Sequence, residues 1–230
     1  MFVQVDERHR GDLRWATPLL LAAIVFAYLW LSNIEPERFY QVVSRWGLVP
    51  ARVFDFSEGW LAWLLELKPL AVLSALLIHA DLLHLVSNLL FLLIFGLAAE
   101  RRLGSGLFLL LFLVGGALAN VSAALSMLGR LGAIVGASGA VSAIVGAYIT
   151  LFPRSHLGLV IPLGAFLEFV RVPAVWLIGF WILLQLLIAY INPTFGAVAW
   201  VAHAAGFIAG VLFAMACRPI VYKRLRHLRP

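Results

Sequence analysis

The chain has 230 residues, of which 63% are hydrophobic and only 12% are charged, whereas soluble domains average about 25% charged residues. A soluble protein of this length has too little interior for so much apolar surface, so the composition excludes an ordinary cytosolic enzyme and a disordered chain. The single cysteine, Cys217, excludes an intrachain disulfide and a cysteine-rich metal cluster. The composition therefore indicates an integral membrane protein.

A helix needs about 20 apolar residues to cross the core of a bilayer. The first such run covers about 15–31. It is longer than the apolar region of a typical secretory signal, and no small-residue cleavage site follows it, so we expect a retained anchor. A loop follows over about 32–68. Within it, residues 57–67 predict a short Trp-rich helix, capped by Ser57, that lies at the membrane interface.

The second span is predicted at about 81–100, because Asp81 is a good N-cap residue and Glu100 ends the apolar run. We expect an all-α integral membrane protein in which a bundle of six transmembrane helices forms one domain over residues 15–217, with a large interfacial first loop. The remaining four spans are predicted at about 105–127, 131–152, 172–191 and 195–217.

The basic residues sort by side of the membrane. Twelve of the seventeen Lys and Arg residues fall on the face that carries both termini, and five fall on the other. The positive-inside rule then places the N-terminal tail (1–14) and the basic C-terminal tail (218–230) in the cytoplasm, and we expect a bacterial plasma (inner) membrane. Acidic lipids of the bilayer account for the basic tail, and no RNA- or DNA-binding motif accompanies it, so no nucleic-acid partner is expected.

Polar groups inside membrane spans are rare and suggest function by default. Three histidines, His79, His84 and His203, lie in apolar stretches; Asn88 follows His84 by one turn, and Ser138 lies in the run GASGA. Given the predicted spans, Ser138 and His203 lie about 10–12 Å below the outer surface, and the first two turns of span two carry His84 and Asn88 on one face. Three spans thus place polar groups at a similar depth.

Small residues accompany these polar groups. Gly136 and Gly139 flank Ser138, and Gly206 and Gly210 follow His203. Small residues permit close approach of membrane helices. A single such pair usually serves ordinary packing, but here the pairs also supply the proximity that a hydrogen-bonded serine and histidine need.

The chemistry that this pattern favours is nucleophilic catalysis. A serine hydroxyl is a weak nucleophile until a neighbouring imidazole takes its proton. The backbone N–H groups beside Ser138, the Asn88 amide and the His84 ring are candidate donors to an oxyanion. Asp81 is the only acid near this depth and is expected to act as a cap, so we predict a Ser-His dyad rather than a triad.

Two other classes remain open at this point. The three histidines are candidate ligands of a metal transporter, because imidazole is a common metal ligand, although only Asp81 adds an acidic group nearby. The same fold without turnover would be a membrane protein that binds substrates for quality control.

The chain resembles the rhomboid intramembrane serine proteases from about residue 15 to 217. Three short motifs in the right order, on the right spans, carry the resemblance. They are H-x-x-x-x-H-x-x-x-N (His79, His84, Asn88), G-x-S-G (Gly136, Ser138, Gly139) and A-H-x-x-G-x-x-x-G (Ala202, His203, Gly206, Gly210).

The resemblance implies hydrolysis of peptide bonds in or near transmembrane segments of single-span or other membrane-protein substrates, without a cofactor or metal. Ser138 would be the nucleophile and His203 the general base. Asn88, His84 and the Ser138 N–H would form the oxyanion site, and His79 would line the same wet cavity, which opens to the outer side. In this family, the fifth span and the loop after it gate substrate entry.

One position departs from some well-known members of the family. They carry a tyrosine four residues after the nucleophile, and its ring stacks on the catalytic histidine. Here that position is Ser142, so the motifs do not identify the group that orients the imidazole.

Overall fold

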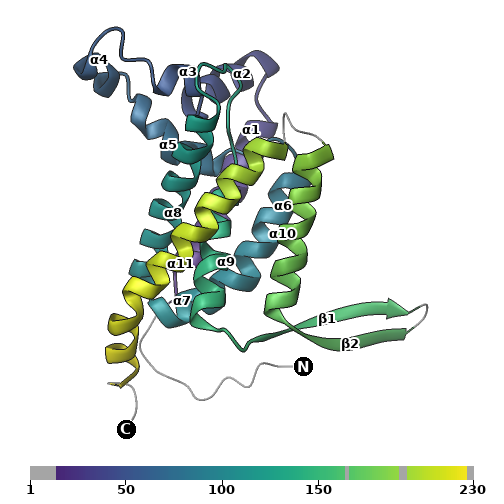
Figure 1. Cartoon of the computed structure of the whole chain (residues 1–230). Coiled ribbons are helices and arrows are strands. Elements are labelled where there is room, and N and C mark those ends of the chain that lie inside the picture. The colour runs from purple at the N-terminus through teal and green to yellow at the C-terminus, as the bar shows by residue number, and fades with distance from the viewer. Residues whose placement is uncertain (1–13, 164–165, 192–195, 227–230) are drawn as a thin grey trace.

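The computed structural model describes residues 14–163, 166–191 and 196–226, and it is a helical bundle (Figure 1). This confirms the predicted all-α membrane fold. Four helical segments are long and apolar enough to cross a membrane, and two shorter apolar helices correspond to the predicted first and fourth spans. The four long segments are Leu82–Leu103, Ser105–Ser126, Ala174–Ile191 and Trp200–Val221, and the two shorter helices are Ala16–Ser32 and Ser138–Leu151.

Helix α1 (Ala16–Ser32) is capped by a distant carboxylate. Its own N-cap residue offers no side-chain acceptor. Instead, the Ala16 and Thr17 N–H groups donate to Glu100 at 2.9 and 3.0 Å, and the Ser105 hydroxyl donates to the same carboxylate at 2.5 Å. Glu100 is only 1% exposed. A carboxylate at a helix N-terminus satisfies orphan N–H groups and complements the helix dipole, so Glu100 ties α1 to the end of the second span.

The first loop forms a separate cap on one end of the bundle (Figure 1). In its tip, α4 begins at Trp60 after Gly59, which has a φ of +90° and no side-chain cap. The predicted capping role of Ser57 is therefore wrong: its N–H donates to Asp55, and this bond together with one from the Ser57 hydroxyl lowers the pKa of Asp55. In the structure, the first loop extends past the predicted end near residue 68 and reaches the second span. It contains α2 (Pro36–Trp46), α3 (Pro50–Val53), α4 (Trp60–Leu65), η1 (Lys68–Leu70), α5 (Ala71–Ser74) and η2 (Ala75–Leu77).

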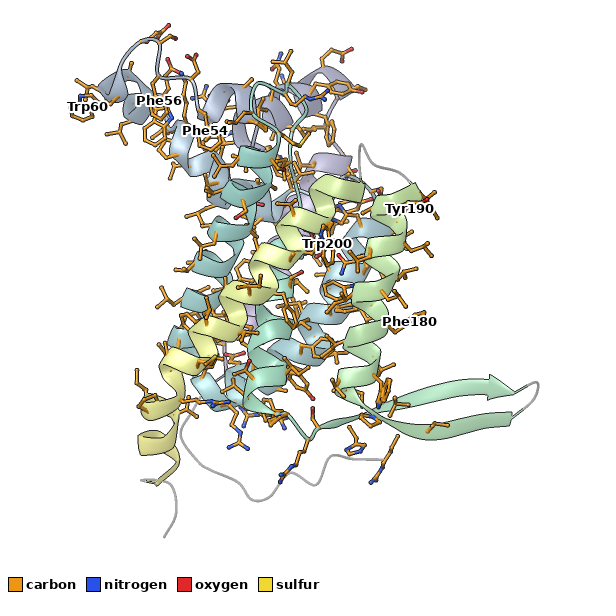
Figure 2. All side chains as sticks on the ribbon, in the orientation of Figure 1. Phe54, Phe56, Trp60, Phe180, Tyr190 and Trp200 are labelled. Atoms are coloured by element: carbon orange, nitrogen blue, oxygen red, sulfur yellow. The ribbon has the colours of Figure 1, made fainter. Side chains whose placement is uncertain are left out.

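Apolar side chains cover much of the outer surface. Trp60 on α4 is 68% exposed, and Phe180 and Tyr190 on α10 are similarly open; Figure 2 shows all three pointing away from the bundle. Such a large exposed apolar surface is unfavourable in water and suits contact with lipid. The surface of α4 agrees with an interfacial first loop.

The second span is one continuous helical segment made of α6 (Leu82–Phe91), the π-helical turn η3 (Leu92–Gly96) and α7 (Leu97–Leu103). The predicted N-cap is confirmed, because the Asp81 carboxylate accepts the His84 N–H at 2.8 Å. Helix α8 (Ser105–Ser126) follows after Gly104.

Helix α9 (Ser138–Leu151) begins later than the fourth span was predicted to begin. The preceding segment is not helical, because Ile134 pairs with Leu48 of the first loop through two backbone hydrogen bonds of 2.8 and 3.0 Å. Ser138 is therefore the first residue of the helix, rather than lying two turns inside it. All residues of α9 from Gly139 to Tyr148 are buried, so this helix is the centre of the bundle.

The last two helices complete the bundle. Helix α11 (Gly196–Arg226) runs diagonally across α9, and α10 (Ala174–Ile191) lies beside it (Figure 1). Helix α11 continues through Pro219 and enters the segment predicted as a C-terminal tail. Most of the N-terminal tail lies outside the described residues.

A β-hairpin occupies the connection between α9 and α10, where we expected only a loop. Strands β1 (His156–Leu163) and β2 (Phe166–Pro173) pair antiparallel, with His156 opposite Pro173. The hairpin projects from the end of the bundle opposite the first loop (Figure 1). The segment is rich in Val, Ile and Phe, which favour strands.

Glu100→Ala should lower the free energy of unfolding by about 2–4 kcal/mol, because it removes the acceptor of two buried N–H groups of α1 and of the partly buried Ser105 hydroxyl. Reversible unfolding of the purified protein in mixed micelles measures this change. Glu58→Ala, which removes an exposed carboxylate of the first loop, should change the free energy by less than about 0.5 kcal/mol. Equal effects of the two substitutions would contradict the capping role.

Candidate active site

The turn before Ser138 is shaped by a glycine. Gly136 has a φ of +119°, which L side chains rarely adopt. A Cβ atom here would also lie 2.5 Å from Cε1 and 2.6 Å from Nε2 of His84. Gly136 therefore allows the His84 imidazole to lie directly against the backbone two residues before Ser138, which joins two of the sequence motifs in space.

His79 contacts the backbone of the same turn. Its ring is 1% exposed, Nε2 lies 3.4 Å from the Ala137 N–H donor, and Nδ1 lies 3.3 Å from the Leu77 carbonyl oxygen. These partners fit a neutral imidazole that donates from Nδ1 and accepts at Nε2. The structure thus places His79 as a buried link between the start of the second span and the residue before Ser138. Its predicted contact with a wet cavity stays a prediction.

His84 and Asn88 lie one turn apart on α6, as their spacing predicts. His84 is half-buried and its ring centroid is 5.0 Å from that of His79. Asn88 is buried, and its amide donates to the His84 carbonyl oxygen at 2.8 Å. A carboxamide has two N–H groups, so this bond leaves Asn88 a second donor.

Helices α9 and α11 touch through their backbones beside Ser138 and His203. A Cβ atom on Gly206 would overlap the Gly139 carbonyl oxygen, and one on Gly139 would lie 3.8 Å from the Ala202 carbonyl oxygen. Gly139 directly follows Ser138, and Ala202 directly precedes His203. The two predicted catalytic residues therefore lie at the same level of the bundle. Both residues are described, and the Ser138 hydroxyl forms no hydrogen bond with the His203 ring. Catalytic hydrogen bonds are often long when no substrate is bound.

The side chain of His203 is held by α10. Its Nδ1 is hydrogen-bonded to Oε1 of Gln185. The centroids of the His203 and Trp181 rings are 5.9 Å apart, and the angle between the ring planes is 32°. Gln185 belongs to none of the three sequence motifs and was not predicted as a site residue. The available signal was that Gln185 is the only amide or charged side chain in the apolar helix α10.

Ser142 does not replace the tyrosine that some rhomboids carry at this position. It is fully buried, and its hydroxyl donates to the Ser138 carbonyl oxygen at 2.7 Å. The aromatic ring beside His203 comes from Trp181 on α10 instead.

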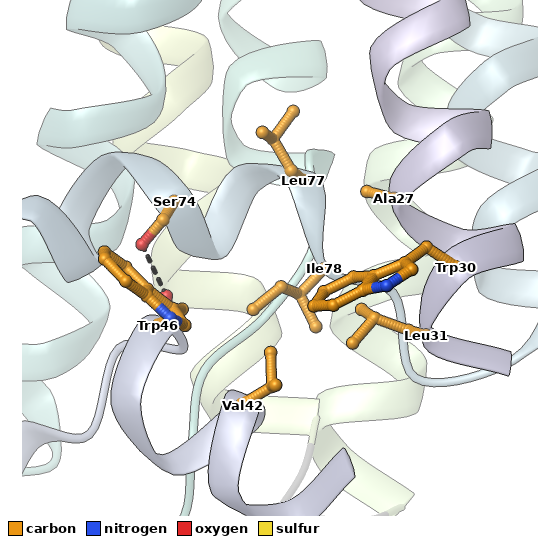
Figure 3. A pocket seen from close by; sticks show the side chains of 8 residues that line it. All are labelled: Ala27, Trp30, Leu31, Val42, Trp46, Ser74, Leu77 and Ile78. Atoms are coloured by element: carbon orange, nitrogen blue, oxygen red, sulfur yellow. Dashed lines mark hydrogen bonds between the residues drawn. The ribbon is translucent and has the colours of Figure 1, made fainter. Parts of the chain in front are cut away.

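An apolar pocket of about 250 Å³ lies elsewhere, between α1, α2 and the segment leading to His79 (Figure 3). The Ser74 hydroxyl donates to the Trp46 carbonyl oxygen at 2.6 Å at its edge. None of the predicted site residues lines this pocket, so it does not mark the predicted site. The lining residues are Ala27, Trp30, Leu31, Val42, Trp46, Ser74, Leu77 and Ile78.

The described residues contain no group of three or more His, Cys, Asp or Glu side chains arranged to hold a metal ion. His79 and His84 lie together, but Nδ1 of His203 faces Gln185. This geometry gives the metal-transport alternative no ligand set in the described part of the chain.

The fold and these contacts define an all-α integral membrane protein with a cluster of polar side chains among its helices. A model of the Rhomboid domain matches residues 67–220, a range that includes every predicted site residue. The chain therefore belongs to the rhomboid family. A comparison with curated proteins finds no match.

Gly206→Ala should lower the free energy of unfolding by about 1–3 kcal/mol, because the added methyl group pushes α11 away from the Gly139 carbonyl. Gly179→Ala is the matched control: this glycine of α10 has open space around it, so the substitution should be neutral or slightly stabilising. Unfolding in mixed micelles compares the two variants. Equal stabilities would show that the α9–α11 contact is looser than described.

Proposed function

We propose that the protein is an intramembrane serine protease that hydrolyses peptide bonds in or near transmembrane segments of other membrane proteins. The observation that carries the proposal is the backbone contact of α9 with α11, which brings Ser138 and His203 to one level. Membership in the rhomboid family supports it, because rhomboids are typically intramembrane serine proteases.

In this proposal, His203 removes the proton from the Ser138 hydroxyl as Oγ attacks the scissile carbonyl carbon. The carbonyl oxygen becomes an oxyanion, which the Ser138 N–H, the second Asn88 N–H and the His84 ring stabilise. His203 then gives its proton to the leaving nitrogen, and the C–N bond breaks. Water, deprotonated by His203, then attacks the acyl carbon. His203 gives this proton to the Ser138 Oγ as the ester C–O bond breaks, which releases the acid and restores the Ser138 hydroxyl.

The positions of the proposed oxyanion donors fit this role. Ser138 opens α9, so its N–H is among the first four of the helix, which have no intrahelical acceptor. His84 lies against Gly136, and Asn88 follows one turn later on the same helix. The Ser138 N–H and the Asn88 amide carry no charge, so they add none to a site that is surrounded by apolar helices.

We infer that substrates enter beside α10. Ala174 and Ile178 are the buried residues of this 18-residue helix, and most of its other side chains face outward. Between α10 and α6, Trp181 and Phe91 are in contact, with ring centroids 5.6 Å apart. An outward movement of α10 would separate these rings and open a path from the lipid toward Ser138.

Ser138→Ala and His203→Ala should each abolish labelling by a fluorophosphonate probe, since one removes the nucleophile and the other its base. Asn88→Ala should keep the nucleophile but lower kcat on a membrane-embedded substrate by about 10²–10³-fold, through loss of one oxyanion donor. Gel fluorescence measures the labelling, and a cleavage assay in proteoliposomes measures kcat.

Ser122→Ala is the matched control for the serine substitution. Ser122 donates to a carbonyl oxygen one turn earlier in α8, as Ser142 does in α9, and it lies outside the proposed site. Its labelling should equal that of the unmodified protein. Labelling that survives Ser138→Ala would overturn the assignment, and substrate capture without cleavage would indicate a binding protein instead.

We propose that both termini lie in the cytoplasm and that the site opens to the outer side. The charge distribution of the sequence supports this orientation. The end of α7, the hairpin and the end of α11 lie at one end of the bundle, and the first loop lies at the other (Figure 1).

A cysteine introduced at Glu58 should react with a membrane-impermeant maleimide added outside intact cells, and a cysteine at Arg154 should react only after the membrane is opened. Both residues are exposed; Glu58 lies just before α4, and Arg154 lies between α9 and β1. Figure 1 shows α4 and the hairpin at opposite ends of the bundle. Cys217 is replaced by alanine first. The reverse labelling pattern would invert the proposed orientation.

A further inference from the structure

The contact between Gln185 and His203 joins two helices in a setting where a polar side chain is costly. Gln185 lies in a helix of otherwise apolar residues, and its Nε2 is buried with no hydrogen-bond partner among the described residues. A buried donor without an acceptor destabilises the folded protein. A leucine at this position would have no unpaired donor. We therefore expect the amide to have a function, and its bond to His203 indicates which one.

The direction of this bond decides whether His203 can act as a base. A neutral imidazole carries its proton on either Nδ1 or Nε2. When the Gln185 Oε1 accepts, the proton is on Nδ1, and the lone pair of Nε2 is free. In the opposite arrangement, the Gln185 Nε2 would donate to Nδ1, and the proton would occupy Nε2. The structure has Oε1 at Nδ1.

Trp181 fixes the plane of the same imidazole. It precedes Gln185 by one helical turn, so the two side chains lie on one face of α10. Its ring is tilted by 32° to that of His203. The amide thus selects the tautomer and the indole restricts ring rotation, and both come from a helix that carries neither Ser138 nor His203.

We propose that Gln185 is the positioning residue of the catalytic base: its Oε1 accepts the His203 Nδ1–H and leaves Nε2 to take the Ser138 proton. This inference rests on the proposed protease function. It assigns to α10 the orienting role that a tyrosine on the helix of the nucleophile has in some rhomboids. Because Gln185 acts through His203, it affects the chemical step and not substrate binding.

The kinetic test replaces the amide while keeping the length of the side chain. Gln185→Met removes the acceptor and should lower kcat by about 10–100-fold with KM unchanged. Gln185→Glu keeps an acceptor oxygen and should retain kcat within about three-fold. Ile188→Met is the matched control, because this residue of α10 is 49% exposed, and it should match the unmodified protein. A loss in KM alone, or no recovery with Gln185→Glu, would overturn the proposal.

A second measurement needs no substitution of Gln185 and no turnover. In protein with nitrogen-15-labelled histidine, the NMR signal of His203, assigned by its loss in His203→Ala, should show a protonated Nδ1 and a bare Nε2. A protonated Nε2 would overturn the inference even where the Gln185 variants fail to fold. If the unmodified protein shows no probe labelling and no cleavage, the proposed function fails, whereas full activity of Gln185→Met refutes only this inference.

Discussion

The structure depends on the close approach of α9 and α11, in which backbone meets backbone without intervening side chains. Cβ atoms on Gly206 and Gly210 would overlap carbonyl oxygens of α9, and one on Gly146 would overlap the Phe207 carbonyl oxygen of α11. Apolar side chains gain little by leaving lipid for another helix, so this close packing has to hold the pair together. No rotamer can absorb a change at such a contact, and the relative position of Ser138 and His203 is correspondingly rigid.

Long-range polar bonds attach the remaining elements to this pair. The Asn120 amide of α8 donates to the Val72 carbonyl oxygen of the first loop at 2.8 Å, and Glu100 holds the start of α1. His79 performs the same task at the turn before Ser138. In each case a buried polar group satisfies backbone groups at a helix end or in a loop, where helical hydrogen bonds are missing. Ser138, at the start of α9, thus lies where irregular backbone meets the central helices.

The sequence predicted those features of the fold that depend on neighbouring residues, namely the apolar helices and one helix cap. Hydropathy located the apolar helices, and the Asp81 cap follows from a preference that acts within one turn. The start of α9 was missed, because the apolar segment before Ser138 reads as helix until Leu48, distant in sequence, takes up the Ile134 backbone groups. Motif spacing grouped Ser138 with His203, but it could not find Gln185, which belongs to no motif and is placed only by the packing of α10 on α11.

Two side chains that contact the His203 ring, Gln185 and Trp181, both belong to α10, so the position of this ring depends on that helix. In the rhomboids that carry a tyrosine four residues after the nucleophile, the orienting ring lies on the nucleophile's own helix. Here α10 holds His203 through Gln185 and Trp181, while Trp181 also contacts Phe91 of α6. A displacement of α10 that parts Trp181 from Phe91 also withdraws Gln185 from the imidazole. In the proposed mechanism, the return of α10 brings Gln185 back to Nδ1 of His203, so the chemical step follows closure of α10.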